Sequence, residues 1–339
     1  MRFFRTILSA LTVVALAACG GGSGGGAVLP GGTDPGTRGA GGSTVAFQKD
    51  TLWVAYETSV HAFSTDSNGP VTPLKSLGSF PWNGNPAFGF PGIVDIAVAP
   101  DGTQWELENR DFAEGGRGWR LNAVAPGAAT LPENTDGDDN SYPFAFALAG
   151  DGVMVGYNNG SDVIATYPYG ASNAQPLRTF TGTSRIYGFA SGNDGHLYVA
   201  RPTGFEVYDP TSTGCCPIRT ITTNAPATMG SSGGFAVGPE NSIYVVDVSG
   251  GYQSHVMYVN VFPPGSSTVG RRIGPLPTSY DPLGHAPRIT VDALNRLYVA
   301  TNGQLYRFGA GADGAATPER VMTDSAIGNP TALAIGPKL

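Results

Sequence analysis

Six residues that each follow an apolar segment are the best candidates for binding chemistry. Gapless alignment of the segments gives Tyr56, Glu108, Asn158, Arg201, Asp247 and Thr301. If the segments are strands around one axis, these residues approach one rim of a central channel, and converging polar groups at a concavity form a candidate binding site. The alternative interpretation is that they are polar because strand ends meet water, with Arg201 and Asp247 forming an ion pair.

Glu108, Asn158 and Asp247 could also bind a metal ion, because calcium takes six to eight oxygen ligands from carboxylate and amide groups. A second calcium candidate is the acidic segment 134–140, although a solvated turn explains it as well. The four histidines are scattered, and the chain contains neither a His-Glu-x-x-His nor a Gly-x-Ser-x-Gly motif. We assign no catalytic residue, and no cofactor other than calcium.

The elements that must position these residues are repeated hairpins. The repeat occurs at 43–55, 95–107, 144–156, 186–200, 234–246 and 288–300. Asp101-Gly102, Asp151-Gly152 and Asp194-Gly195 stand at the turns, which predicts tight type I′ turns because Gly accepts a positive φ. The second segment of each hairpin is almost wholly apolar, as expected for a strand that is buried on both faces.

Two further strands follow each hairpin. The third ends in a turn rich in Gly and Pro, and the fourth carries Pro two residues before a basic residue, as in Pro217 and Arg219. Pro and a basic residue are typical of an exposed sheet edge. Four antiparallel strands per repeat with the edge outside predict an all-β fold, a β-propeller.

We expect six four-stranded blades, with seven as the alternative. The last segment, 330–339, repeats a first strand and then stops, so it can close the ring as the inner strand of the first blade. Val45-Ala46-Phe47 competes for that position. The second blade is the most degenerate, with poor third and fourth strands around 117–131.

The units ITVDALNRLYVA (289–300, preceded by Arg288) and GFAVGPENSIYVVD (234–247) resemble those of the NHL-repeat and SMP-30-like propellers. The resemblance implies architecture over most of 44–339. It does not select one function, because such propellers include protein-, sugar- and peptide-binding modules as well as metal-dependent lactonases.

The N-terminus predicts export. Residues 1–18 have a charged start, a short apolar core and small residues at the end, which is typical of a signal peptide. Leu16-Ala17-Ala18-Cys19 resembles the lipobox of bacterial lipoproteins, which implies that Cys19 is acylated and becomes the first mature residue. Residues 19–43 form a Gly-rich tether, and 44–339 form the propeller. Gly20 follows the cysteine, and by resemblance to the sorting of enterobacterial lipoproteins it favours the outer membrane of the cell envelope.

The net charge of the chain limits the classes of partner that it can bind. The net charge is −7, and removing Arg2 and Arg5 makes it −9. Because nucleic acids need a basic surface, we expect no nucleic-acid partner.

Adjacent Cys215 and Cys216 could form a strained vicinal disulfide in an oxidising envelope, or remain two loop thiols.

These observations favour a lipid-anchored binding or scaffold propeller that contacts an envelope protein or polysaccharide, with the membrane reached through the anchor. The alternative is a metal-dependent hydrolase or lactonase at the channel mouth.

Overall fold

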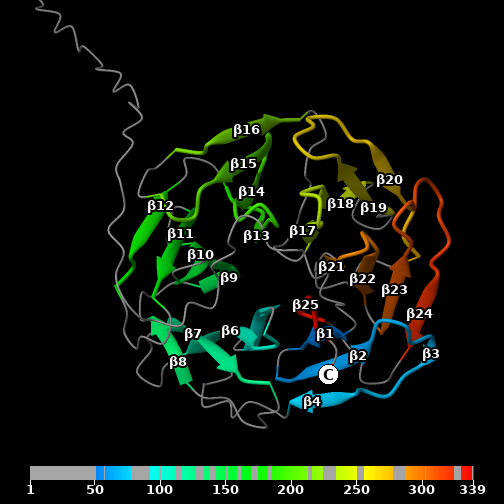
Figure 1. Ribbon diagram of the computed structural model, residues 1–339, viewed down its shortest axis with the longest axis horizontal. Coiled ribbons are helices and arrows are strands. Elements are labelled where there is room, and N and C mark those ends of the chain that lie inside the picture. Colours follow the sequence, from blue (N-terminus) through cyan, green and yellow to red (C-terminus); the bar gives the residue numbers. More distant parts are fainter. Residues whose placement is uncertain are drawn as a thin grey trace, which may run out of the picture. The chain divides into compact units, whose positions relative to one another are not determined.

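Six sheets, each with four antiparallel strands, are arranged as the blades of a propeller in the computed structural model (Figure 1). The structure describes residues 51–56, 58–77, 92–99, 101–111, 117–126, 133–137, 142–149, 152–158, 162–168, 175–181, 185–212, 216–223, 234–249, 256–277, 287–301, 303–323, 330–337 and 339. All of them belong to one compact unit, 38–339. The prediction of an all-β propeller with six four-stranded blades is therefore confirmed, and the alternative of seven blades is wrong.

In every blade the strands succeed one another from the central axis outwards. Blade 1 consists of β25 (Ala332–Gly336), β1 (Thr51–Ala55), β2 (Val60–Ser64) and β4 (Lys75–Leu77), and blade 2 of β5 (Gly92–Val98), β6 (Gln104–Asp111), β7 (Arg117–Val124) and β8 (Glu133–Gly137). Blade 3 consists of β9 (Tyr142–Ala149), β10 (Gly152–Asn158), β11 (Asp162–Tyr167) and β12 (Arg178–Thr181), and blade 4 of β13 (Gly188–Ser191), β14 (Leu197–Arg201), β15 (Gly204–Tyr208) and β16 (Arg219–Thr222). Blade 5 consists of β17 (Phe235–Val237), β18 (Ile243–Ser249), β19 (Val256–Phe262) and β20 (Arg271–Ile273), and blade 6 of β21 (Arg288–Val291), β22 (Leu297–Thr301), β23 (Gln304–Phe308), β24 (Arg320–Thr323) and the short β3 (Gly69–Pro70).

The C-terminal strand closes the ring, as the sequence predicts. Strand β25 pairs antiparallel with β1, with Leu52 opposite Ile335 and Val54 opposite Leu333. The two ends of the propeller segment thus complete one sheet, which joins blade 1 to the rest of the ring. Val45-Ala46-Phe47, the competing segment, lies outside the described residues.

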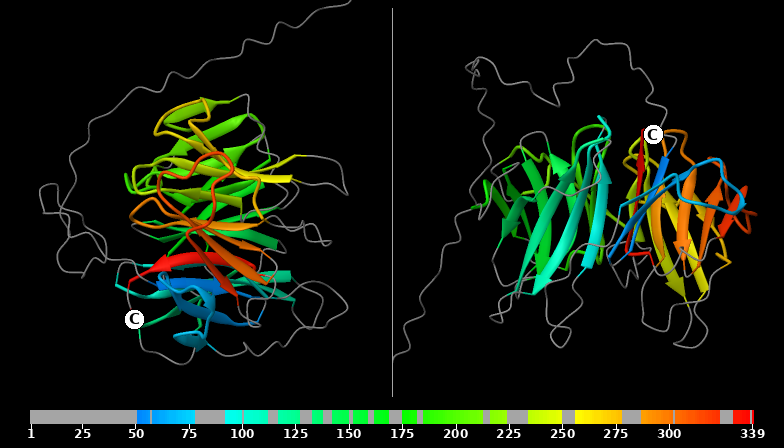
Figure 2. Two further views of the ribbon diagram at one scale, coloured as in Figure 1. Left: turned by 90° about the vertical axis from the view of Figure 1, so that its right-hand side faces the viewer. Right: turned by 90° about the horizontal axis from the view of Figure 1, so that it is seen from below.

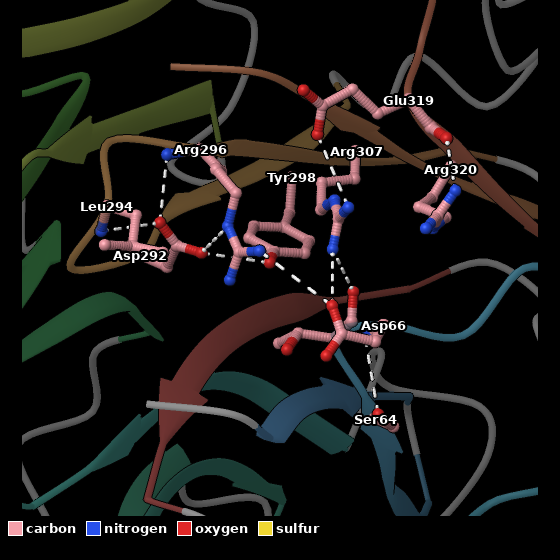
Figure 3. Close-up of polar contacts among 10 residues, drawn as sticks. Ser64, Asp66, Asp292, Leu294, Arg296, Tyr298, Arg307, Glu319 and Arg320 are labelled. Atoms are coloured by element: carbon pink, nitrogen blue, oxygen red, sulfur yellow. Dashed lines mark hydrogen bonds and ion pairs between the residues drawn. The ribbon is translucent and has the colours of Figure 1, made fainter. Parts of the chain in front are cut away.

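A second connection joins blades 1 and 6. Strand β3 follows β2 in the chain but pairs in parallel with β24, and Arg307 Nη1 of β23 donates to the Thr65 carbonyl at 2.7 Å and to Asp66 Oδ1 at 3.0 Å (Figure 3). In blade 6 the fourth strand is therefore not the edge of the sheet, contrary to the sequence prediction. The pairing of a Gly-Pro segment leaves no pattern that sequence analysis could detect.

Apolar side chains fill the seams between neighbouring blades. Trp53, Tyr198, Tyr244 and Tyr298 of the second strands are all at most 2 % exposed, which agrees with the prediction that these strands are buried. The second strands carry buried side chains on both faces, because each blade packs against two others (Figure 2). This packing fixes the inner strands around the central axis.

The turns of the inner hairpins differ from the prediction. Gly195 N donates to the Gly192 carbonyl, and Gly192 N donates to the His196 carbonyl, so the loop has three residues. Only one loop residue has a positive φ in each described case: Gly102 (87°), Gly195 (80°), Asn241 (61°) and Asn295 (60°). A type I′ turn needs two such residues, whereas one is the mark of a type I turn followed by a left-handed residue. The type I′ prediction is therefore wrong for these hairpins.

Blade 2 is more regular than its sequence suggests. Strand β7 pairs with β6 over eight residues, and β8 then pairs with β7. Residues 133–137, which include the first part of the acidic calcium candidate, form the fourth strand of a blade rather than a solvated turn. The polar sequence of β8 hid this strand, because an outer edge strand needs few apolar residues.

The predictions for residues 1–43, namely the signal peptide, Cys19 and the tether, lie outside the described residues. Within the described part of the chain, no helix has the length and apolar character needed to cross a membrane.

Candidate functional site

A cavity of about 430 Å³ lies on the axis of the ring and is lined by the six inner strands. Each inner strand pairs with only one neighbouring strand, so its other edge faces the cavity. The lining is otherwise apolar except for a few side chains, among them Asp95, Arg288, Thr290 and Thr331. Such a cavity suits a small ligand that is held by a few polar contacts.

Asp95 and Arg288 occupy equivalent positions in the repeat. Arg288 pairs with Ala300 and Asp95 with Leu107, at matching places in their second strands. Together with the equivalent residues of the other blades, they form one layer of the channel. In blades 1, 3 and 4, for which the structure describes this position, the residue is small: Ala332, Ala145 and Gly188. The layer therefore brings one cation and one anion to the lumen, on the two blades that flank blade 1, and leaves space between small side chains.

Asp95 is fixed by backbone donors. The N–H of Phe146 on the neighbouring inner strand donates to Oδ2 at 3.0 Å, and the N–H of Ile96 donates to Oδ1 at 2.9 Å. Burial raises the pKa of Asp95 to about 6, while the two N–H groups and the Arg288 charge oppose the rise. At neutral pH the carboxylate is therefore ionised and keeps free lone pairs for a donor group in the channel.

Arg288 is the cation of this layer. Its Nε and Nη1 atoms are buried and have no hydrogen-bond partner among the described residues. Burial lowers the pKa of Arg288, and the Asp95 carboxylate partly offsets this effect. The hydroxyl of Thr331, which also lines the cavity, is buried without a partner in the described part of the chain. These donors can bind an anionic group.

The six residues predicted from the strand ends lie one strand further out. None of them is among the described residues that line the cavity. Arg201 Nε contacts Glu206 Oε2 at 2.6 Å, and Asp247 Oδ2 contacts Arg272 Nη2 at 2.9 Å. Arg201 and Asp247 thus form ion pairs within their own blades, because side chains of a second strand meet the third and fourth strands.

The other four residues also lie within their own blades, and none is among the described residues that line the cavity. Glu108 is buried and accepts a hydrogen bond from Asn122 Nδ2 at 3.5 Å. Tyr56 packs edge-on against His61, and Thr301 ends β22. Asn158 ends β10, and its side chain lies outside the described residues. The binding role of the six residues stays a prediction.

The calcium prediction gains no support from this arrangement. Glu108 lies on β6 of blade 2 and Asp247 on β18 of blade 5, far apart in the ring (Figure 1). Among the described residues, no three His, Cys, Asp or Glu side chains come close enough to share a metal ion. Cys216 is exposed and Cys215 lies outside the described residues, so the disulfide also stays a prediction.

Sequence analysis missed Asp95 and Arg288, although a signal exists. The aligned first strands read DIAV, AFAL, GFAS and RITV, so a charge replaces a small residue in two repeats. The predicted site rested instead on the ends of the second strands, where polar residues are expected in any case.

Known structures share the fold at low sequence identity. A protein of unknown function from Bacteroides caccae matches with a TM-score of 0.52 and 9% identity, over 84% of this chain and 98% of that one. A "putative 6-phosphogluconolactonase" from Bacteroides uniformis matches with a TM-score of 0.51 and 12% identity, over 84% and 99%. These likenesses show the fold alone. No protein-family model matches the chain, and neither does any curated protein.

Proposed function

We propose that this propeller is a binding module whose central channel takes a small hydroxylated carboxylate, such as an acidic sugar. The observation that carries the proposal is Arg288, a cation that lines the cavity and whose guanidinium has two buried donor atoms without a partner in the described part of the chain. A buried donor without a partner costs about 1–3 kcal/mol. A carboxylate in the channel can reduce that cost, because its oxygens accept charge-assisted hydrogen bonds from the guanidinium.

The rest of the layer sets the remaining features of the ligand. Asp95 carries an ionised carboxylate at neutral pH and accepts hydrogen bonds, so it suits the hydroxyl groups of the same ligand. Ala332, between the two charged residues in the ring, leaves room for the body of the ligand. The cavity of about 430 Å³ falls in the size range of small-molecule sites.

The predicted anchor at Cys19 gives this ligand a context. A lipid-anchored domain of the cell envelope would meet acidic sugars as units of envelope polysaccharide. The partner is thus still an envelope polysaccharide, as the sequence predicts. The proposal adds that this polysaccharide contains an acidic sugar, which Arg288 binds. An envelope protein as partner would instead use the outer surface of the ring.

A direct test is calorimetric titration of residues 38–339 with sugar acids and with the matching neutral sugars. We expect binding of the acids only, and roughly 10- to 100-fold weaker binding by Arg288→Gln, the range of a charged hydrogen bond. Arg219→Gln, which removes an exposed arginine of β16, is the matched control and should bind as the wild type does.

Two outcomes would overturn the proposal. One is equal affinity of wild type and Arg288→Gln for every acid that binds. The other is hydrolysis of sugar lactones that depends on a divalent ion, which would establish the alternative of a metal-dependent lactonase.

A further inference from the structure

Glu106 breaks the pattern of the second strands at a buried position. The equivalent residue is valine in all five other blades: Val54, Val155, Val199, Val245 and Val299. Those five valines are at most 2 % exposed, and Glu106 is 0 % exposed. Its side chain lies on the face of β6 toward blade 1, where an apolar cluster that includes Trp53, Ile96 and Val124 fills the seam. An ionised carboxylate is costly at such a place.

Gln104 is the partner of Glu106. It lies two residues earlier on the same face of β6 and is 2 % exposed. Its Nε2 donates to Glu106 Oε1 at 2.5 Å, a short hydrogen bond. The other oxygen of each group, Gln104 Oε1 and Glu106 Oε2, is buried without a partner in the described part of the chain. If Glu106 is ionised, both remaining atoms are acceptors and neither can satisfy the other.

We propose that Glu106 is a neutral carboxylic acid in the folded protein and forms a cyclic acid–amide pair with Gln104. The proton on Glu106 Oε2 then donates to Gln104 Oε1, while Gln104 Nε2 donates to Glu106 Oε1. One proton satisfies both orphan oxygens and removes the buried charge. The seam between blades 1 and 2 is thus built around a bound proton.

The charges around the pair favour the neutral form. Glu108 follows on the same face and repels a second negative charge, and Arg120 lies opposite Glu108 on β7. On the facing blade, Lys75 is a cation whose Nζ lies 5.8 Å from the Trp53 ring centroid, and no cation is among the causes of the pKa shift of Glu106. Desolvation, followed by the charge of Glu108, raises the pKa of Glu106 to about 8.

Loss of this proton to water leaves a carboxylate against apolar side chains. The expected result is a seam that loosens at alkaline pH while the other five, which have valine at this position, do not respond. The inference does not depend on the channel ligand, because Glu106 faces blade 1 and not the lumen.

The experiment combines infrared spectroscopy with thermal unfolding of residues 38–339. The wild type should show the carbonyl band of a protonated acid in the folded state, lost with a midpoint near pH 8, and Glu106→Gln should lack that band. Gln at 106 cannot ionise and can form an amide–amide pair, so its Tm relative to wild type should rise by roughly 5 °C between pH 6 and 8.

Two variants serve as controls. Glu240→Gln, in an exposed turn, should leave both the band and the pH dependence of Tm unchanged. Glu106→Val restores the residue of the other blades and should also remove the band. The proposal is overturned if the wild type lacks the band at neutral pH, if Glu106→Gln keeps it, or if a chelator lowers the neutral-pH Tm of the wild type but not of Glu106→Gln.

Discussion

Asp95 and Glu106 lie on paired strands of one blade, yet one belongs to the channel and the other to a seam. Two backbone N–H groups donate to Asp95, and its pKa rises only to about 6. Glu106 receives one side-chain donor and has Glu108 beside it, and its pKa rises to about 8. Burial is a cause in both regions, so the difference shows how donors and neighbouring charges decide which buried carboxyl stays ionised.

This difference separates two roles. At neutral pH the channel presents a charged carboxylate to a ligand, whereas the seam contains a neutral acid that only packs and pairs. The same desolvation therefore supports binding in one region and structure in the other.

The largest expected effect is that Glu106→Gln stabilises the protein at pH 7.5, whereas Asp95→Asn destabilises it. Glu106→Gln should raise the free energy of unfolding by up to about 4 kcal/mol, because a carboxyl with a raised folded pKa loses about 1.4 kcal/mol per pH unit as the pH rises from its unfolded pKa. For Glu106 that window runs from 4.5 to about 8. Chemical denaturation across this window measures the effect, and a Glu106→Gln variant with the wild-type pH slope would contradict it.

Asp95→Asn should act in the other direction. An amide offers one acceptor oxygen where two N–H groups now donate, so the variant should lose about 1–3 kcal/mol at pH 7.5. Its deficit should shrink as the pH rises from 3.8 to about 6, because the wild type loses stability across this window and the variant, which cannot ionise, does not. Equal stability of Asp95→Asn and wild type at pH 7.5 would mean that the two backbone donors do not hold Asp95.

A smaller effect tests the charge beside Glu106. Glu108→Gln removes the repulsion and should lower the midpoint of the acid band by about one pH unit. Glu240→Gln is again the control. An unchanged midpoint would assign the raised pKa to burial alone.

The smallest expected effect concerns Asp95 and Arg288, the two charged residues of the channel. Arg288→Gln removes the cation that favours ionised Asp95, so the pKa of Asp95 should rise by about half a unit. Carbon NMR of the Asp95 carboxyl measures it, with Arg219→Gln as control. A fall in this pKa would contradict the placement of Arg288 and Asp95 in the same layer of the channel.

The sequence is sufficient to predict the ring, because hairpins repeat their turn residues and their apolar second strands. The same repeat contains the signal for both carboxyl regions, as charges at positions that are small or valine elsewhere. Which of these positions face the lumen or a seam depends on the packing of blades, and no local pattern encodes it. Strands β3 and β8 escaped prediction because their pairing depends on neighbours distant in sequence or on an edge position.

The proposed function depends above all on Arg288 binding an anionic group in the channel. The most direct test is a crystal structure of residues 38–339 with the acid that binds most tightly in the titration. We predict a carboxylate within hydrogen-bond distance of the Arg288 guanidinium, with a hydroxyl group on Asp95. A ligand bound instead at the strand ends, beside Arg201 or Asp247, with an empty channel would contradict this prediction.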